Sequence, residues 1–247
     1  MPDLHFGPVL PATMPCMCCR YLRSSDKRRL IETFHLCGQS NDPASIELPP
    51  CDYNVAPATR QPVIRHNRNN GERELVLMRW GLVPQYAKGL KDFSGTSTIN
   101  ARADTLYQKA IWRIPLQRRR CIIPADGFYE WQALLSMTRT NGRRTKRPFA
   151  FTMADGQPFA FAGLWSAWKC PENGDWLQSF AIITTEANEL MAPVHNRMPV
   201  ILRSEDYTRW LSRDSAEPLP IDLLRPYPAE AMQTVPCDVF NAQTVSS

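Results

Sequence analysis

The chain has 247 residues, of which 43% are hydrophobic and 21% are charged, as in an ordinary folded protein. This composition excludes an intrinsically disordered chain, and no apolar run approaches the ~20 residues that a membrane-spanning helix needs. The net charge of +5 favours a polyanionic partner without identifying one. We therefore expect a soluble, cytoplasmic protein with no membrane association.

The N-terminal segment is rich in proline and ends in a cluster of cysteines. It has neither the basic start nor the continuous apolar stretch of a signal peptide. Cys16, Cys18 and Cys19 suggest a zinc site as one reading. Adjacent thiolates suit tetrahedral coordination poorly, however, and no second Cys-x-x-Cys or paired His follows. We expect no metal and no cofactor.

The first predicted elements are a helix and a β-hairpin. The helix lies within residues 24–38, where Ser25 or Asp26 can cap its start and Gly38 can end it. A Pro-rich loop follows over residues 48–61. Strands are then expected at residues 62–66 and 74–82, joined by Asn-Arg-Asn-Asn-Gly-Glu, which is a hairpin signature.

The remainder of the chain reads as many strands with a few helices between them. Helices are predicted at residues 104–112, 186–192 and 204–213. Strands are predicted at residues 121–131, 147–153, 158–168, 178–185 and 198–202. This pattern indicates an α+β fold with a curved mixed or antiparallel sheet. Since there is no internal repeat and no linker, we expect a single domain.

Basic residues cluster at Arg118–Arg120 and within residues 139–147. The second cluster surrounds Asn141-Gly142, a turn signal between two apolar runs. We interpret it as the solvated tip of a hairpin.

Glu130 is the first candidate for chemistry. It lies in a predicted strand among aromatic residues, and strict alternation puts it on one face with Phe128, while Tyr129 and Trp131 share the other. A poorly hydrated aromatic face disfavours the charged form of a carboxylate. A general acid near neutral pH must keep its proton, so such a face suits this role. The alternative is a solvated residue on an outer face.

Two further segments carry reactive side chains. Residues 97–105 contain Asn100, Arg102 and Asp104, and His195 and Arg197 would share one face if their segment is extended. Taken singly, an Asn in a loop is usually a turn former and a lone His is usually structural. Their joint occurrence with Glu130 and the cysteines favours a site.

Six ordered motifs resemble those of the SRAP family, the SOS-response-associated peptidases, also described as abasic-site processing proteins. The resemblance covers Met17 to about Asn241 and departs from the family at three positions, where Cys19 replaces Gly, Asp104 replaces Glu and Tyr86 replaces Trp. The motifs are Met17–Arg20, Tyr53–Pro57, Trp80–Pro84, Asn100–Arg102, Gly127–Trp131 and His195–Pro199.

The resemblance implies a barrel-like sheet flanked by helices over residues 18–241, with residues 242–247 as a tail. It also implies a covalent thiazolidine crosslink between an N-terminal cysteine and the aldehyde of an abasic site in single-stranded DNA. Cys18 would be the nucleophile and Asn100 would orient it. Glu130 would shuttle protons, and His195 would assist ring opening and closure.

The same resemblance implies a DNA-binding surface on a monomeric protein. Arg20, Arg102 and Arg197 would hold phosphates, which position a strand without reading its sequence. Asn54, Pro57 and Tyr86 would shape the groove, with Tyr86 as a stacking platform for a base. The expected partner is single-stranded DNA with abasic sites, in the SOS response to DNA damage, so the protein would join the nucleoid when bound.

Two other functions stay open on the sequence. The first is a thiol peptidase or autopeptidase that uses Cys18 with His195 and Glu130. The second is a non-catalytic binder of single-stranded DNA. Because an amide nitrogen cannot form an imine, the crosslink needs Cys18 at the end of the chain. We therefore expect residues 1–17 to be a mis-assigned start or a leader that is removed, with Met17 as the true initiator.

Overall fold

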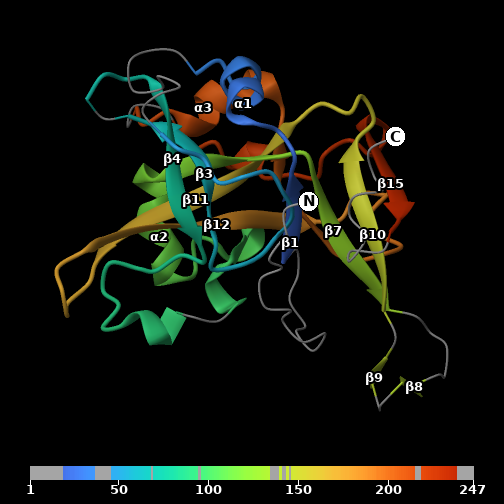
Figure 1. Cartoon of the computed structure of the whole chain (residues 1–247), viewed down its shortest axis with the longest axis horizontal. Coiled ribbons are helices and arrows are strands. Elements are labelled where there is room, and N and C mark those ends of the chain that lie inside the picture. The colour runs from blue at the N-terminus through green and yellow to red at the C-terminus, as the bar shows by residue number, and fades with distance from the viewer. Residues whose placement is uncertain are drawn as a thin grey trace, which may run out of the picture.

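In the computed structural model, the described residues form two large β-sheets, a small two-stranded sheet and three helices (Figure 1). The structure describes residues 19–36, 46–67, 69–93, 96–133, 139–140, 143–144, 146–214 and 218–237. The helices are α1 (Lys27–Thr33), α2 (Ala110–Arg118) and α3 (Tyr207–Leu211). Short 3-10 turns are η2 (Leu90–Phe93), η3 (Thr96–Thr98), η4 (Ala103–Thr105), η5 (Ser204–Asp206), η6 (Ile221–Leu223) and η7 (Ala229–Ala231).

The larger sheet contains a closed, mixed barrel of five strands. Strand β12 pairs in parallel with β4 and antiparallel with β11, and the order β4-β3-β6-β11 is antiparallel throughout, which closes the ring. Strands β5 and β13 add to β12, and β14 adds to β11. Its strands are β3 (Arg60–His66), β4 (Arg73–Trp80), β5 (Asn100–Arg102), β6 (Arg120–Ala125), β11 (Phe159–Lys169), β12 (Trp176–Glu186), β13 (Arg197–Pro199) and β14 (Ile201–Leu202).

The smaller sheet has the strand order β15-β10-β7-β1-β2 and lies to one side of the barrel, at the right of Figure 1. Strand β1 is therefore an interior strand, although it lies near the start of the chain. The pair β8 (Arg139–Thr140) and β9 (Arg143–Arg144) extends beyond β7 and β10. The five strands are β1 (Arg20–Arg23), β2 (Asp52–Val55), β7 (Gly127–Ala133), β10 (Lys146–Met153) and β15 (Met232–Pro236).

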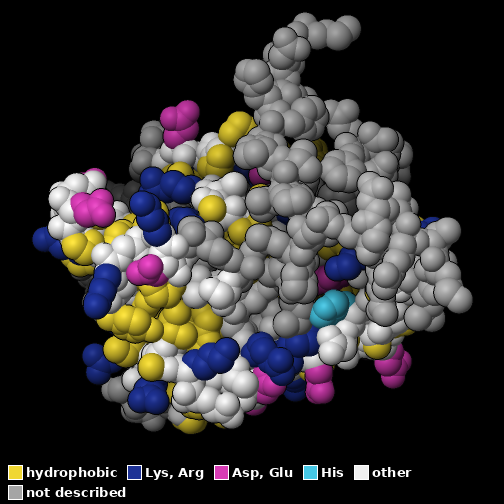
Figure 2. Space-filling view, turned by 90° about the horizontal axis from the view of Figure 1, so that it is seen from below, with side chains coloured by type: hydrophobic (Ala, Val, Ile, Leu, Met, Phe, Trp, Pro, Cys, Tyr) yellow, Lys and Arg dark blue, Asp and Glu magenta, His cyan; other side chains and the backbone are white. Residues whose placement is uncertain are grey.

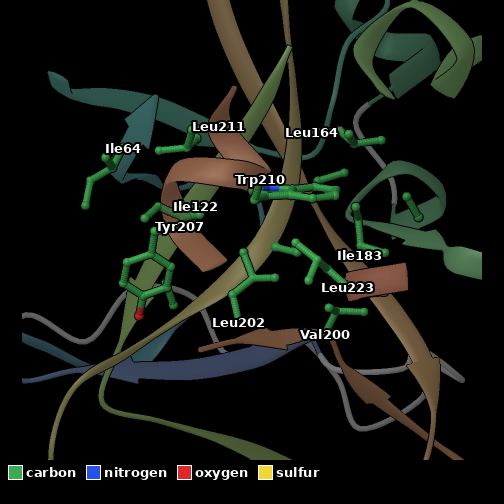
Figure 3. Packing of buried hydrophobic residues seen from close by; sticks show 14 of the residues in the cluster. Ile64, Ile122, Leu164, Ile183, Val200, Leu202, Tyr207, Trp210, Leu211 and Leu223 are labelled. Carbon is green, nitrogen blue, oxygen red and sulfur yellow. The ribbon is translucent and has the colours of Figure 1, made fainter. Parts of the chain in front are cut away.

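Alternating side chains of the barrel strands pack into two hydrophobic clusters. In β6, Ile122 joins the cluster that the three helices cover, while Cys121 and Ile123 join the cluster that packs against the smaller sheet. Trp210 of α3 lies at the centre of the helix-covered cluster (Figure 3) and donates from Nε1 to the carbonyl of Cys121 (2.8 Å). We call the second cluster the inter-sheet cluster; it contains Trp80, Phe128 and Phe161.

The curved mixed sheet, the hairpin and the first helix are confirmed. Strands β3 and β4 pair antiparallel across the predicted turn. Asp26 caps α1 by accepting from the backbone N–H of Arg29 (2.8 Å). The helix ends at Thr33, before the predicted Gly38, and His35 takes a positive φ of 49° just beyond it. Strands β7 and β10 also form the predicted antiparallel pair around the basic turn, and Asn141 and Gly142 lie outside the described residues.

The prediction of one strand over residues 121–131 is wrong. The segment divides into β6 and β7, which belong to different sheets. The break falls at Asp126, whose carboxylate accepts from the backbone N–H groups of Ser24 and Ser25 (2.8 and 2.9 Å). Gly127 follows, where a Cβ atom would approach the carbonyl of Phe151 to 2.9 Å. Both partners come from elsewhere in the chain, although the dipeptide Asp126-Gly127 is itself a turn signal that the prediction of one strand passed over.

The helix predicted at residues 186–192 is also wrong. Glu186 still belongs to β12, and Asn188 starts a series of turns by accepting from the backbone N–H of Met191 at its side chain (2.9 Å). The helix expected at residues 104–112 begins later, at Ala110, after a short 3-10 turn. The segment 198–202 divides into β13 and β14.

The basic run Arg118–Arg120 does not form an open cationic surface. Arg120 is buried, and its guanidinium donates to carbonyls at the C-terminal ends of α2 and α3. Its acceptors are Trp210, Leu116, Gln117 and Ser212. Arg120 therefore joins two helix ends, where positive charge is favourable.

Candidate active site

The first described residue, Cys19, lies at the open end of β1, and Cys18 lies outside the described residues. Arg20 pairs with Tyr129 in the antiparallel register of β1 and β7. Cys19 precedes Arg20 and Glu130 follows Tyr129, so the end of this pairing brings Cys19 and Glu130 near one another. Cys19 also packs against the inter-sheet cluster. The chain thus enters the smaller sheet next to the candidate acid.

Glu130 is buried, with 2% of its surface exposed, and the predicted alternation is confirmed. Phe128, on the same face, stacks on Phe151 with ring centroids 5.1 Å apart. Tyr129, on the other face, donates from its hydroxyl to the carbonyl of Tyr53 (2.9 Å). One oxygen of Glu130 accepts from the backbone N–H of Trp131 (3.3 Å). A carboxylate is therefore held in a poorly hydrated position on a rigid strand.

His195 follows a turn that contacts the same strand. Gln132, two residues beyond Glu130, donates from Nε2 to the carbonyl of Pro193 (2.8 Å). The backbone N–H of Arg197 donates to Nδ1 of His195 (3.1 Å), and the Arg197 carbonyl lies 3.3 Å from the same nitrogen. With Nδ1 as the acceptor, a neutral ring carries its proton on Nε2. His195 is thus half of a compact turn rather than part of an extended segment.

Asn100 opens β5, which pairs in parallel with β12 at Ile182. The carbonyl of the preceding Ile99 accepts from Nε1 of Trp80 (3.0 Å), which fixes the entry to this strand. The residues close in sequence to Asn100, Glu130 and His195 show that their three segments meet. Ile99, Phe128 and Met198 belong to the inter-sheet cluster, and each lies one to three residues from a candidate catalytic residue.

The three arginines assigned to phosphate binding differ in their surroundings. Arg20 donates to the side-chain oxygen of Asn54 (3.1 Å), and Arg102 pairs with Asp104 (2.7 Å). The side chain of Arg197 is only 10% exposed. It donates to the carbonyl of Thr184 (2.7 Å) and approaches Asp104 (3.4 Å). Arg197 therefore supports β12 and the 3-10 turn η4 from inside, while Arg102 faces solvent.

The expected groove residues lie at the surface or close to it. Asn54 and Pro57 are half-buried, and Tyr86 is 67% exposed. The chain beneath Tyr86 is anchored, because Nε1 of Trp168 donates to the carbonyl of Ala87 (2.8 Å). On one face of the molecule, Figure 2 shows Lys and Arg side chains along the lower edge, running from a hydrophobic patch to an exposed histidine.

Two residues near the candidate site were not found from the sequence. Gln132 could have been noticed, because it follows Glu130 by the strand period of two. Arg79 gave no local signal, since its surroundings come from β3, β12 and the loop after β4.

The described ranges contain no group of three or more His, Cys, Asp or Glu side chains that could hold a metal ion. In the same ranges, every helix is too short or too polar to cross a membrane.

Sequence comparison matches residues 17–241 to the family described as SOS response associated peptidase (SRAP). Abasic site processing protein YoqW of Bacillus subtilis (strain 168) is 43% identical over 182 residues, which cover 73% of this chain and 76% of that protein. Abasic site processing protein HMCES of Pongo abelii is 33% identical over 190 residues, covering 64% and 52%.

Solved structures support the same relationship. A protein of Bacteroides thetaiotaomicron superposes with a TM-score of 0.77 at 25% identity, covering 93% of this chain and 95% of that one. A protein of Bordetella bronchiseptica has a TM-score of 0.72 at 29% identity, covering 90% and 100%. The predicted α+β, barrel-like fold is therefore shared with solved proteins.

Proposed function

Because this chain belongs to the SRAP family, we propose that it processes abasic sites in single-stranded DNA by crosslinking to them through Cys18. The observation that carries the proposal is the register of β1 against β7, which brings Cys19 near the buried Glu130. Cys18 directly precedes Cys19 in the chain. The names of the relatives supply the substrate class.

The proposed reaction begins when the α-amine of Cys18 attacks the aldehyde carbon of a ring-opened abasic sugar. The resulting carbinolamine loses water to give an imine, with Glu130 donating the proton that the departing oxygen needs. The Cys18 thiol then adds to the imine carbon, and its proton passes to the nitrogen, which closes a thiazolidine ring. An α-amine has a pKa of ~7.7–8.0 and is partly neutral at physiological pH. Asn100 would orient Cys18.

The hydrogen bonding of His195 supports a donor role in this reaction. Since Arg197 N–H occupies Nδ1, the neutral ring presents an N–H at Nε2. Such a donor suits the sugar oxygen that departs when the ring opens. A thiol peptidase needs the opposite arrangement, a ring nitrogen that accepts the thiol proton. The second contact of Nδ1, to the Arg197 carbonyl at 3.3 Å, is the longer one.

DNA would follow the surface around the open end of β1. Arg20 and Arg102 would contact phosphates, and Tyr86 would stack on a base. Arg197 would act mainly by positioning Asp104 and the end of β12. Asn54 and Pro57 would shape the groove near Arg20.

The test compares two expressed forms of the chain, one beginning at Met1 and one at Met17. Each is incubated with single-stranded DNA containing one abasic site, and covalent adducts are separated on a denaturing gel. Intact-mass measurement of the protein identifies the first residue. We expect adducts only from chains that begin at Cys18 after methionine removal, and none from the Cys18→Ala variant.

Three outcomes test the mechanism and its alternatives. Chemical blocking of the α-amine abolishes the thiazolidine but leaves a thiol peptidase active. A chain that retains residues 1–17 by mass and still forms the adduct would contradict the mechanism. If Cys18→Ala retained all activity of the protein toward DNA, a non-catalytic binder would be favoured.

A further inference from the structure

Arg79, the penultimate residue of β4, is a buried cation with few partners. It is 9% exposed, and among the described residues its guanidinium makes one hydrogen bond, from Nη1 to the carbonyl of Gly81 (2.7 Å). A guanidinium carries five N–H donors. Most of the hydrogen-bonding capacity of this side chain is therefore not used by the described residues around it.

No described carboxylate compensates the charge. Burial lowers the pKa of Arg79, and no acidic group acts on it in the opposite direction. Its direct partner across the antiparallel pair is Arg60, an exposed residue whose side chain makes no hydrogen bond or ion pair with the described residues. Like charges opposed on neighbouring strands are destabilising, and a buried charge normally has a counter-charge. The charge of Arg79 therefore calls for a bound anion.

The donors of Arg79 are accessible from outside. Its nitrogens are not among the fully enclosed atoms that lack a partner, so those not bound to Gly81 reach solvent. Gly81 has a φ of +112°, and a Cβ atom there would lie 2.8 Å from Nη1. Only glycine lets the guanidinium rest against the chain in this way. The position of Arg79 is therefore specified by the backbone beside it.

A second polar group lies on the segment that pairs with this loop. The carbonyl of Thr98 accepts from the backbone N–H of Leu82 (3.1 Å), and the buried Thr98 hydroxyl has no partner among the described residues. The surroundings also connect to the candidate site: Trp80 binds the carbonyl of Ile99, next to Asn100. Tyr86 follows Gly81 by a single short loop.

We propose that Arg79 holds a phosphodiester of the bound single strand, between the abasic nucleotide near Asn100 and the base on Tyr86. This inference rests on the proposed function. A planar guanidinium matches the geometry of a phosphate and binds it through charge-assisted hydrogen bonds. The phosphate supplies the negative charge that the fold omits.

The test measures binding of single-stranded DNA by Arg79→Gln over a range of salt concentrations. One lost phosphate contact flattens the log–log salt slope by about 0.7. Loss of a charge-assisted hydrogen bond weakens binding by roughly 10- to 100-fold. Arg28→Gln is the matched control, because Arg28 is an exposed cation on α1 paired with Glu32, and it should leave both values unchanged.

A scan with methylphosphonates, which remove the charge of one phosphate at a time, locates the contact. The wild-type protein should lose affinity at one position next to the abasic nucleotide, and Arg79→Gln should be insensitive at that same position. A protein in which Arg79 were merely structural would lose stability and keep the wild-type scan. If Arg79→Gln does not fold, Arg79→Lys is scanned instead and should show a weakened response at that position.

The failures are distinguishable. Wild-type protein that binds and crosslinks DNA normally, with a scan that Arg79 variants do not alter, overturns the subsite alone. Wild-type protein that neither binds nor crosslinks abasic DNA overturns the proposed function and the subsite with it.

Discussion

Arg120 and Arg79 are buried almost equally, at 7% and 9% exposure, yet the protein treats their charges differently. Arg120 lies between α2 and α3 and donates to four backbone carbonyls. Arg79 lies on the loop side of β4 and donates to one. The two arginines therefore differ not in burial but in the number of guanidinium N–H donors that find an acceptor. Arg120 is satisfied by the helix ends around it, whereas Arg79 keeps donors for the phosphate that we propose.

The largest expected effect concerns the buried carboxylate of the candidate site. Glu130→Gln should slow formation of the DNA adduct by ~10²–10⁴-fold, because it preserves shape and removes proton transfer. The unfolding free energy should change little. The rate is measured on denaturing gels with saturating abasic DNA, and stability by urea unfolding.

Glu74→Gln is the matched control on the structural side. Glu74 pairs with Arg65 (2.6 Å), so its substitution should lower stability and leave the adduct rate of the folded protein intact. An unchanged rate for Glu130→Gln would assign Glu130 to the structure and break the comparison.

The next effect tests the Arg120 side of the comparison. Arg120→Met should lower the unfolding free energy by roughly 2–4 kcal/mol, because several buried carbonyls lose their donor. Folded Arg120→Met should bind DNA normally. Arg118→Met, on the exposed end of α2, should stay within about 0.5 kcal/mol of wild type. If Arg120→Met left the unfolding free energy unchanged, the number of satisfied N–H donors would not distinguish the surroundings of Arg120 from those of Arg79.

The smallest effect concerns Asp104, which lies between Arg102 and Arg197. Its hydrogen bond with Arg102 lowers the pKa of the carboxyl below 3.8, and Arg197 adds to the shift. A lowered pKa stabilises the folded state above pH 3.8, and that contribution is lost as the pH falls through the folded value.

Asp104→Asn should therefore be less stable than wild type near pH 7, by under about 1 kcal/mol because the pair is half-exposed. The difference should shrink in urea unfolding as the pH is lowered below 3.8, and also at high salt. A difference that is independent of pH would assign the effect to packing.

Much of the fold followed from local sequence, and part of the site did so as well. The turn at residues 67–72 fixed the β3–β4 hairpin, and strand alternation placed Glu130 on its buried face. Strands β1, β2 and β5 were missed, and β2 falls within the predicted Pro-rich loop over residues 48–61. Three or four residues show almost no alternation, and pairing with distant strands stabilises them. Similarly, the Gln132–Pro193 hydrogen bond joins residues that only the tertiary structure brings together.

The interior position of β1 has a consequence for synthesis. This strand is synthesised before its partner β7, which follows after about 100 further residues, so the contact is of high sequence separation. On the proposed mechanism, the reactive amine of a growing chain has neither Glu130 nor a groove beside it until most of the protein has been made. Translation order thus delays the chemistry, and a truncated product would carry the nucleophile without the means to use it.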